Sequence, residues 1–174
     1  VVWQWGEKAP GGAARQNHDL CRLANGNTLL ISKREYPVPS IHSEEFTDQP
    51  IYEVTPAGEI VWQWVGHEHF DELGIDEERA KLLFSKIDVR ARAYIFVLNN
   101  LQPLGPNKWF DGGDERFHPD NIMIDSRETN FIAVIEKSTG KVVWRLGPDY
   151  AAAYDFTKRD FNGPCPKPID TISG

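Results

Sequence analysis

Hydrophobic residues occur along this chain in short runs, in which apolar and polar positions often alternate as they do in β-strands. The clearest runs lie at 20–23, 28–32, 51–64, 94–101, 121–125, 131–136 and 141–146. Most are only a few residues long and end at polar, glycine-containing or proline-containing stretches. The pattern predicts an all-β fold made of short antiparallel strands.

Two glycine-containing turns show how these runs connect. Asn25-Gly26 lies between the runs at 20–23 and 28–32, where it predicts a tight hairpin turn. Gly140 ends the turn before the run at 141–146, and glycine supplies the positive φ that such a turn needs. The three runs of 121–146 therefore predict an antiparallel meander, which is most of one propeller blade.

A short tryptophan phrase occurs three times, at Trp3, Trp62 and Trp144, each time directly after a valine. The second and third copies follow similar hairpins at 51–60 and 132–142. A recurring hairpin indicates stacked β units, none of which buries its apolar face alone. We therefore expect a β-propeller of antiparallel four-stranded blades, with repeats ending near 3–6, 62–66 and 143–147.

Three segments interrupt the repeats. The segments 33–50 and 102–115 contain several prolines or glycines and predict loops, the second of which is expected to shape a ligand site. The segment 67–90 is an insertion that contains a predicted helix at 76–84. Asp76 suits the N-cap of this helix, and apolar residues then recur at helical spacing.

The chain has 174 residues, of which 40% are hydrophobic, which suits one domain of ordinary size. A closed propeller needs at least four blades of roughly 40 residues each, so 1–174 is expected to form a partial propeller. We expect a second polypeptide, from the same precursor, to complete it, with 151–174 as a docking segment. Such processing slightly favours a periplasmic or secreted location.

The charge and the hydrophobic pattern argue against two classes of protein, those that bind nucleic acid and those that span a membrane. The net charge of −7 argues against a nucleic-acid partner, and no apolar run approaches the roughly 18 residues of a membrane span. Cys21 lies in an apolar strand and is expected to be a buried thiol. Cys165 lies in a proline-rich loop and is either free or bridged to another chain.

Histidine and aspartate recur at the starts of two predicted strands. His18-Asp19 precedes 20–23, and His118-Pro119-Asp120 precedes 121–125. These side chains either brace neighbouring turns or line a ligand channel. A histidine near neutrality can act as an acid, a base or a nucleophile. Arg127, at the turn after 121–125, has the planar fork that suits an anionic group.

Metal binding is not predicted. His67 and His69 lie one residue apart, a pattern too weak for a metal site by itself. Acidic residues in and after the loop at 102–115 lack the tight spacing of a calcium loop. No cofactor is expected.

Two stretches resemble a known family. The segments 17–32 (NHDLCRLANGNTLLIS) and 117–150 (FHPDNIMIDSRETNFIAVIEKSTGKVVWRLGPDY) are similar to the arylsulfotransferase family of β-propellers, and the resemblance extends from Val1 to about Tyr150. Members transfer a sulfuryl group from one phenol to another through a sulfated histidine, without a cofactor, at the propeller axis. The resemblance implies an enzyme that acts on a phenolic or anionic small molecule.

The resemblance also implies site residues. The Ser-Arg element of the family, whose arginine binds sulfate, falls on Ser126-Arg127, and a family histidine falls on His18. A His-x-Asn-Ser element falls on 97–100, where Val97 replaces the histidine. We predict catalytic roles for His18, Arg127 and His118, and substrate-binding roles for Asn99, Asn100, Trp109 and Asp120.

Alternative functions remain open at this point. A diverged relative would catalyse hydrolysis or elimination instead of transfer. The segment 133–144 is close to the tryptophan-docking repeat of quinoprotein dehydrogenases, which predicts a blade more than a cofactor. A non-catalytic propeller scaffold would need no polar cluster on the axis, and would be favoured if His18 and Arg127 lay far apart.

Overall fold

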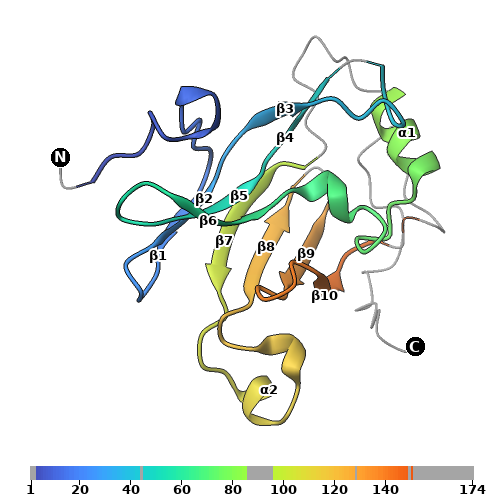
Figure 1. The fold of residues 1–174 in the computed structure, drawn as a ribbon. Helices are drawn as coiled ribbons and strands as arrows, with labels where there is room; N and C mark the ends of the chain where they lie inside the picture. The colour runs from blue at the N-terminus through green and yellow to red at the C-terminus, as the bar shows by residue number, and fades with distance from the viewer. Residues whose placement is uncertain (1–2, 44, 86–95, 128, 149, 151–174) are drawn as a thin grey trace.

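The computed structural model describes residues 3–43, 45–85, 96–127, 129–148 and 150, and short antiparallel strands dominate it (Figure 1). The predicted all-β class is therefore confirmed. The predicted docking segment 151–174, which includes Cys165, and residues 86–90 of the predicted insertion lie outside the described residues.

The first four-stranded sheet has the order β1-β2-β5-β6. Its strands are β1 (Leu20–Arg22), β2 (Thr28–Ile31), β5 (Ile51–Val54) and β6 (Ile60–Trp64). A separate hairpin of β3 (Arg34–Tyr36) and β4 (Phe46–Asp48) is inserted between β2 and β5. Gly26 has φ +86°, so the predicted glycine turn between β1 and β2 is confirmed.

The second sheet is a meander of four consecutive strands in the order β10-β9-β8-β7. These are β7 (Leu98–Pro103), β8 (Ile122–Ser126), β9 (Phe131–Ile135) and β10 (Val142–Leu146). The predicted meander of 121–146 is confirmed, and Gly140 has φ +79° in the turn between β9 and β10. β7 adds the fourth strand and pairs with β8.

Helices are short and lie in the connections. They are η1 (Pro10–Gly12), η2 (Gly66–His69), α1 (Glu77–Ser85), α2 (Lys108–Asp111) and η4 (Glu115–Phe117). α1 confirms the helix expected at 76–84. None of the described helices has the length and apolar character needed to cross a membrane.

Two loop predictions were wrong. The segment 33–50 contains β3 and β4, which pair so that Tyr36 lies opposite Phe46. The prolines follow β3 directly, so they end this strand rather than prevent it. In 102–115, β7 continues to Pro103, and α2 begins after Asn107, whose side chain accepts a hydrogen bond from the backbone N–H of Phe110.

The main core lies between the two four-stranded sheets. Leu29, Ile31 and Ile51 of the first sheet are fully buried in one cluster with residues of the second sheet. Leu98 and Ile122 belong to the same cluster. Burial of large apolar side chains between two sheets is the main favourable term in such a fold. Cys21, predicted to be buried, is a half-exposed free thiol that packs against this cluster.

The tryptophan phrase joins consecutive units. In the first two copies, indole N–H groups donate to carbonyl oxygens in the hairpin turn of the next sheet: Trp3 to Pro56 (3.1 Å), Trp5 to Gly58 (2.9 Å), Trp62 to Lys137 (2.9 Å) and Trp64 to Gly140 (3.1 Å). Trp3 and Trp62 therefore occupy equivalent positions. Trp144 lies on β10, at the edge of the second sheet, and contacts Phe117 with ring centroids 5.8 Å apart. The motif thus has a packing role.

Candidate functional site

The predicted site residues fall into two groups at opposite ends of the second sheet. Arg127 directly follows β8, whereas His118 lies shortly before it. Five residues of antiparallel strand span about 17 Å, which is too far for one small molecule to contact both side chains closely. His18, Asn99 and Asn100 belong with Arg127, as described below. Asp120 belongs with His118.

His18 has a constrained backbone directly before β1. Its φ is +58°, in the left-handed region that residues other than glycine seldom adopt. Such a conformation costs on the order of 1–3 kcal/mol and persists only where the surroundings fix it. Here the backbone N–H of Asn17 donates to Ile31 O (2.9 Å), and that of Asp19 donates to Asn17 O (2.8 Å). The His18 side chain is exposed.

Asp19 connects this turn to the second sheet. One carboxylate oxygen accepts from the backbone N–H of Leu20 (2.8 Å), and the other accepts from the backbone N–H of Leu101 in β7 (3.0 Å). This contact holds His18 beside β7. The sequence showed the recurring His-Asp pattern, but it did not reveal that Asp19 joins two sheets.

The first residues of β7 carry a bulge. Leu98 lies opposite Ser126 and Asn100 lies opposite Asp125, so Asn99 has no partner of its own in β8. A bulge re-aims side chains and is common beside functional sites. Asn99 is half-buried and Asn100 is exposed. Both amides are thus placed at the irregular start of the strand.

Arg127 is held at the same start of β7. Its backbone N–H donates to Val97 O (2.9 Å), and its side chain is exposed. Arg127 therefore contacts Val97, and Asp19 contacts Leu101. These two contact points are four residues apart along an extended chain, which is about 13 Å. Asn99 and Asn100 lie between them. We name His18, Asn99, Asn100 and Arg127 the strand-start group.

Two buried polar atoms near the strand-start group have no hydrogen-bond partner within the described part of the chain. They are Nε2 of Gln49 and Oδ1 of Asp125. Gln49 is fully buried, and its Oε1 accepts from the backbone N–H of Leu98, directly before the bulge. Sequence reasoning missed Gln49 because it lies in the segment that was predicted to be a loop.

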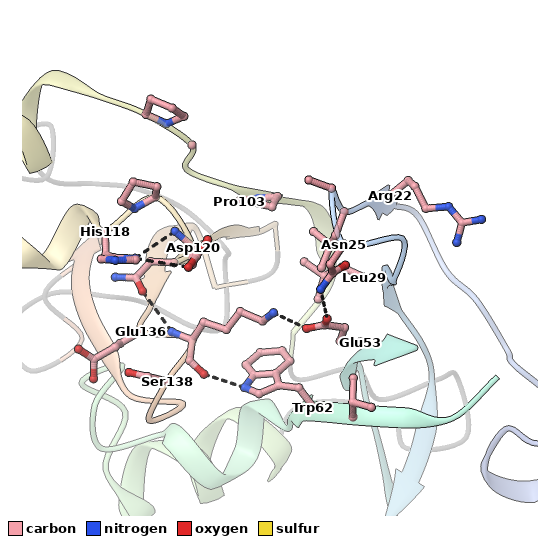
Figure 2. Close-up of a pocket in the computed structure, with 18 of the residues that line it drawn as sticks. Arg22, Asn25, Leu29, Glu53, Trp62, Pro103, His118, Asp120, Glu136 and Ser138 are labelled. Atoms are coloured by element: carbon pink, nitrogen blue, oxygen red, sulfur yellow. Dashed lines mark hydrogen bonds and ion pairs between the residues drawn. The ribbon is translucent and has the colours of Figure 1, made fainter. Parts of the chain in front are cut away.

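The second group borders a cavity of about 1060 Å³ between the two sheets, which His118 and Asp120 line (Figure 2). His118 Nδ1 accepts from the backbone N–H of Asp120 (3.2 Å). The His118 ring meets Phe110 edge to face, with centroids 4.9 Å apart. Trp109 lies on α2, is 55% exposed, and does not line this cavity.

An ion pair between the half-buried Lys137 and the buried Glu53 crosses the same cavity from one sheet to the other. Lys137 Nζ donates to Glu53 Oε2, while Asn27 (2.6 Å) and Asn25 (3.2 Å) donate to Glu53 Oε1. Burial is the largest influence on the Glu53 carboxyl and opposes its ionisation. The hydrogen bonds from Lys137, Asn27 and Asn25 outweigh burial, so the pKa of Glu53 lies below its ordinary value.

The two histidines of η2 contact different carboxylates. His67 Nδ1 lies 2.9 Å from Asp48 Oδ2, and His69 Nδ1 lies 3.2 Å from Glu72 Oε2. Among the acidic residues near the end of the 102–115 segment, Asp114 accepts a hydrogen bond from Arg116. This hydrogen bond is the main reason that the pKa of Asp114 lies below its usual value. No group of three or more His, Cys, Asp or Glu residues in the described ranges is placed to hold a metal ion.

Comparison with known families gives one finding. A family model described as Arylsulfotransferase (ASST) matches residues 16–160, which is most of the chain. Searches of curated proteins and of solved structures gave no match. The matched range includes all the residues of both groups, and the resemblance noted in 17–32 and 117–150 lies inside it. The chain belongs to the arylsulfotransferase family.

Proposed function

We propose that this protein is an arylsulfotransferase-like enzyme that acts on a phenolic or anionic small molecule at the strand-start group. The proposal rests on one structural observation within a chain of this family. Asp19, the neighbour of His18, contacts β7 at Leu101, and Arg127 contacts the chain at Val97 directly before β7, so the two contacts lie on either side of Asn99 and Asn100.

Each side chain of the group suits one part of sulfuryl transfer. The guanidinium of Arg127 presents a planar fork that matches two oxygens of a sulfuryl group. The amides of Asn99 and Asn100 donate to the charge that develops on those oxygens in the transition state. His18, held in a strained and exposed turn, accepts and returns a proton.

The reaction that we propose balances as follows. The oxygen of an acceptor phenol attacks sulfur and loses its proton to His18. The bond between sulfur and the donor oxygen breaks, and that oxygen leaves with the electron pair and takes the proton from His18. With water in place of the acceptor phenol, the same steps give hydrolysis to a phenol and hydrogen sulfate.

The valine at position 97 is consistent with a site that has a single acid–base residue, His18. Val97 stands where the family has a histidine, and its side chain is only 6% exposed. It therefore packs in the interior and adds no acid–base group, which leaves the proton transfer to His18. Diverged chemistry such as hydrolysis or elimination is compatible with one acid–base residue.

We also propose that the two sheets are blades of a β-propeller that a second polypeptide completes. Two four-stranded sheets support this proposal, because the hairpin turn of each accepts indole N–H groups from the tryptophan phrase that precedes it in sequence. Trp144 and β10 repeat the same phrase at the edge of the second sheet. In a further four-stranded unit, a carbonyl oxygen of a hairpin turn would accept a hydrogen bond from the indole N–H of Trp144, as Lys137 O accepts one from Trp62.

The proposed function is tested with 4-nitrophenyl sulfate as donor, with phenol or water as acceptor, and with the release of 4-nitrophenol as readout. We expect His18→Ala to lower turnover by roughly 10²–10⁴-fold, the usual contribution of acid–base catalysis. Arg127→Lys keeps the charge and loses the fork. We expect it to weaken donor binding by at least about 30-fold, as truncation of a partner in a charged contact does.

Matched controls lie elsewhere in the chain. His42→Ala removes a histidine from the β3–β4 connection, and Arg116→Lys changes an arginine that pairs with Asp114 beyond the other end of β8. Both should retain full activity. If His18→Ala and Arg127→Lys fold normally and keep wild-type rates, the strand-start group is not the active site.

A non-catalytic scaffold is the alternative, and the burial of Val97 at the expected histidine position is the observation that favours it. Absence of turnover with phenol and with water, in the native assembly, would select the scaffold. Saturable binding of 4-nitrophenyl sulfate without turnover would then indicate a binding module.

A further inference from the structure

The cavity between the two sheets lies away from the strand-start group. Its lining comes from the β1–β2 turn, the β7–β8 connection and the β9–β10 turn, together with residues of β5 and β6. Its volume of about 1060 Å³ is in the range of pockets that hold small molecules. Neither His18 nor Arg127 contributes to it.

One wall of the cavity is apolar. Leu29, Val61 and Trp62 of the first sheet line it, and Val61 is 55% exposed although it is a large aliphatic side chain. The indole N–H of Trp62 is already bound to Lys137 O, so Trp62 offers its ring and no free donor at this edge. Figure 2 shows Leu29 and Trp62 on the side of the cavity opposite His118 and Asp120.

The cationic side chains that line the cavity are already engaged. The Lys137 ammonium pairs with Glu53. The Arg22 guanidinium donates to Gly26 O (3.0 Å) and Thr28 Oγ1 (2.8 Å), and in Figure 2 it points away from the cavity. His118 is engaged with its neighbour, since its Nδ1 accepts from the backbone N–H of Asp120 (3.2 Å) and lies 4.0 Å from Asp120 Oδ2.

Three further carboxylates line the cavity, those of Glu115, Asp120 and Glu136. Asp120 has a side chain that is 84% exposed, so its charge faces the open side of the cavity. Glu136 accepts a hydrogen bond from Thr139, which fixes one oxygen and leaves the other. The cavity thus has an aromatic and aliphatic wall, a negatively charged wall, and an internally neutralised ion pair between them.

We propose that this cavity is a second ligand site, separate from the strand-start group, which binds a small aromatic amine in its cationic form. The aromatic body packs against Trp62 and Val61. The ammonium group lies toward Asp120 and Glu136, where two carboxylates offset its charge. An anionic aromatic ligand would meet the same carboxylates and is rejected.

Three probes of similar shape test the charge preference by calorimetric titration of the full chain. They are 2-phenylethylammonium, 2-phenylethanol and 3-phenylpropanoate. We expect affinity to decrease in this order, and added salt to weaken only the first. Equal affinity for the three probes, or tighter binding of the carboxylate, would overturn the proposal.

The exposed Asp120 and the half-buried Glu136 give the matching variants, and neither belongs to the hydrophobic core. We expect Asp120→Asn and Glu136→Gln each to weaken 2-phenylethylammonium binding by about three- to fivefold, the usual size of an exposed charge contact. Glu78→Gln removes an exposed carboxylate on α1 and should change nothing. Unchanged binding in the Asp120→Asn, Glu136→Gln double variant places the ligand elsewhere and refutes this site.

Discussion

Asp19 shows how a single side chain can define a site without touching a substrate. Its carboxylate accepts from Leu20 at the start of β1 and from Leu101 within β7, so it fixes the position of His18 relative to Asn99 and Asn100. Because a misplacement of about 1 Å can lower a rate 10²-fold, such a contact matters to catalysis even when the chemistry is done by others.

We therefore predict that Asp19→Ala lowers turnover of 4-nitrophenyl sulfate by roughly 10- to 100-fold. Asp19→Asn still accepts through its amide oxygen and should retain more activity than the alanine variant. Steady-state kinetics distinguish a positioning role from a role in substrate binding. In a positioning role, kcat falls by a larger factor than KM rises. Equal kinetics for Asp19→Ala and wild type would exclude this role.

Glu53 is the residue whose charge couples stability to pH. Its pKa is lower in the folded chain than in the unfolded chain, so its ionised form stabilises the fold above the ordinary carboxyl value of 4.5. That stabilisation is lost as the pH falls through the lowered pKa of the folded state. The carboxylate is nearly buried, so its hydrogen bonds to Lys137, Asn25 and Asn27 are shielded from water.

We predict that Glu53→Gln lowers the free energy of unfolding by about 1–3 kcal/mol near neutral pH, because Lys137 loses a charged partner. The difference between variant and wild type should shrink as the pH falls below 4.5 and through the lowered pKa of folded Glu53, because protonated glutamic acid and glutamine are both uncharged. Urea unfolding over a series of pH values measures this. A difference that stays constant with pH would show that Glu53 is not the coupled group.

At the scale of elements, the sequence predicted the turns and the helix start that depend on one or two local residues. Asn25-Gly26 and Gly140 marked turns because glycine is nearly required at positive φ, and Asp76 marked the start of α1. The β3–β4 hairpin was missed because its strands are three residues long, and buried contacts of Phe46 rather than alternation identify it. Short strands carry too little periodicity to be recognised.

The site was predictable in part for the same reason. The family resemblance brought together residue types that lie far apart in sequence, His18 and Arg127. The resemblance did not assign His118 a site of its own, although the predicted strand at 121–125 already placed His118 and Arg127 at opposite ends. Gln49 and the Asn99 bulge depend on pairing between distant strands, which no local pattern reports.

The tryptophan contacts give a prediction for elements. Trp62→Phe keeps most of the buried ring and removes the hydrogen bond to Lys137 O, so we expect a loss of about 0.5–1.5 kcal/mol. For a domain of this size, 1 kcal/mol corresponds to roughly 2–4 °C in Tm. Calorimetry measures the shift.

Trp144→Phe is the internal comparison for Trp62→Phe. Trp144 contacts Phe117 instead of a turn of a following sheet, and we expect its replacement to change stability by less than about 0.5 kcal/mol in the isolated chain. A larger loss for Trp144→Phe than for Trp62→Phe would contradict the assignment of Trp62 as an intersheet contact.

For the whole molecule, the proposed completion by a second polypeptide has a direct consequence. β10 is an edge strand in the second sheet, and the face that carries Trp144 and the 37% exposed Ile132 would be covered by another unit. We predict that the native protein, examined by mass spectrometry under non-denaturing conditions, is heavier than one 174-residue chain.

Trp144 also supplies a control for that experiment. Trp144→Arg introduces a charge at the proposed contact and should shift the native mass toward that of one chain, whereas Lys108→Glu on α2 should leave it unchanged. A native mass equal to one chain in the wild type, together with full enzymatic activity, would disprove completion by a second polypeptide.

Hydrogen exchange at the backbone N–H of Leu101 reports whether the two sheets remain in contact. β7 is at the edge of its sheet, and this N–H donates to a carboxylate from the other sheet instead of to a neighbouring strand. Its exchange with deuterium therefore reports separation of the two sheets, while the N–H groups inside β8 and β9 report melting of the second sheet alone. One amide signal can thus distinguish parting of the halves from unfolding of either half.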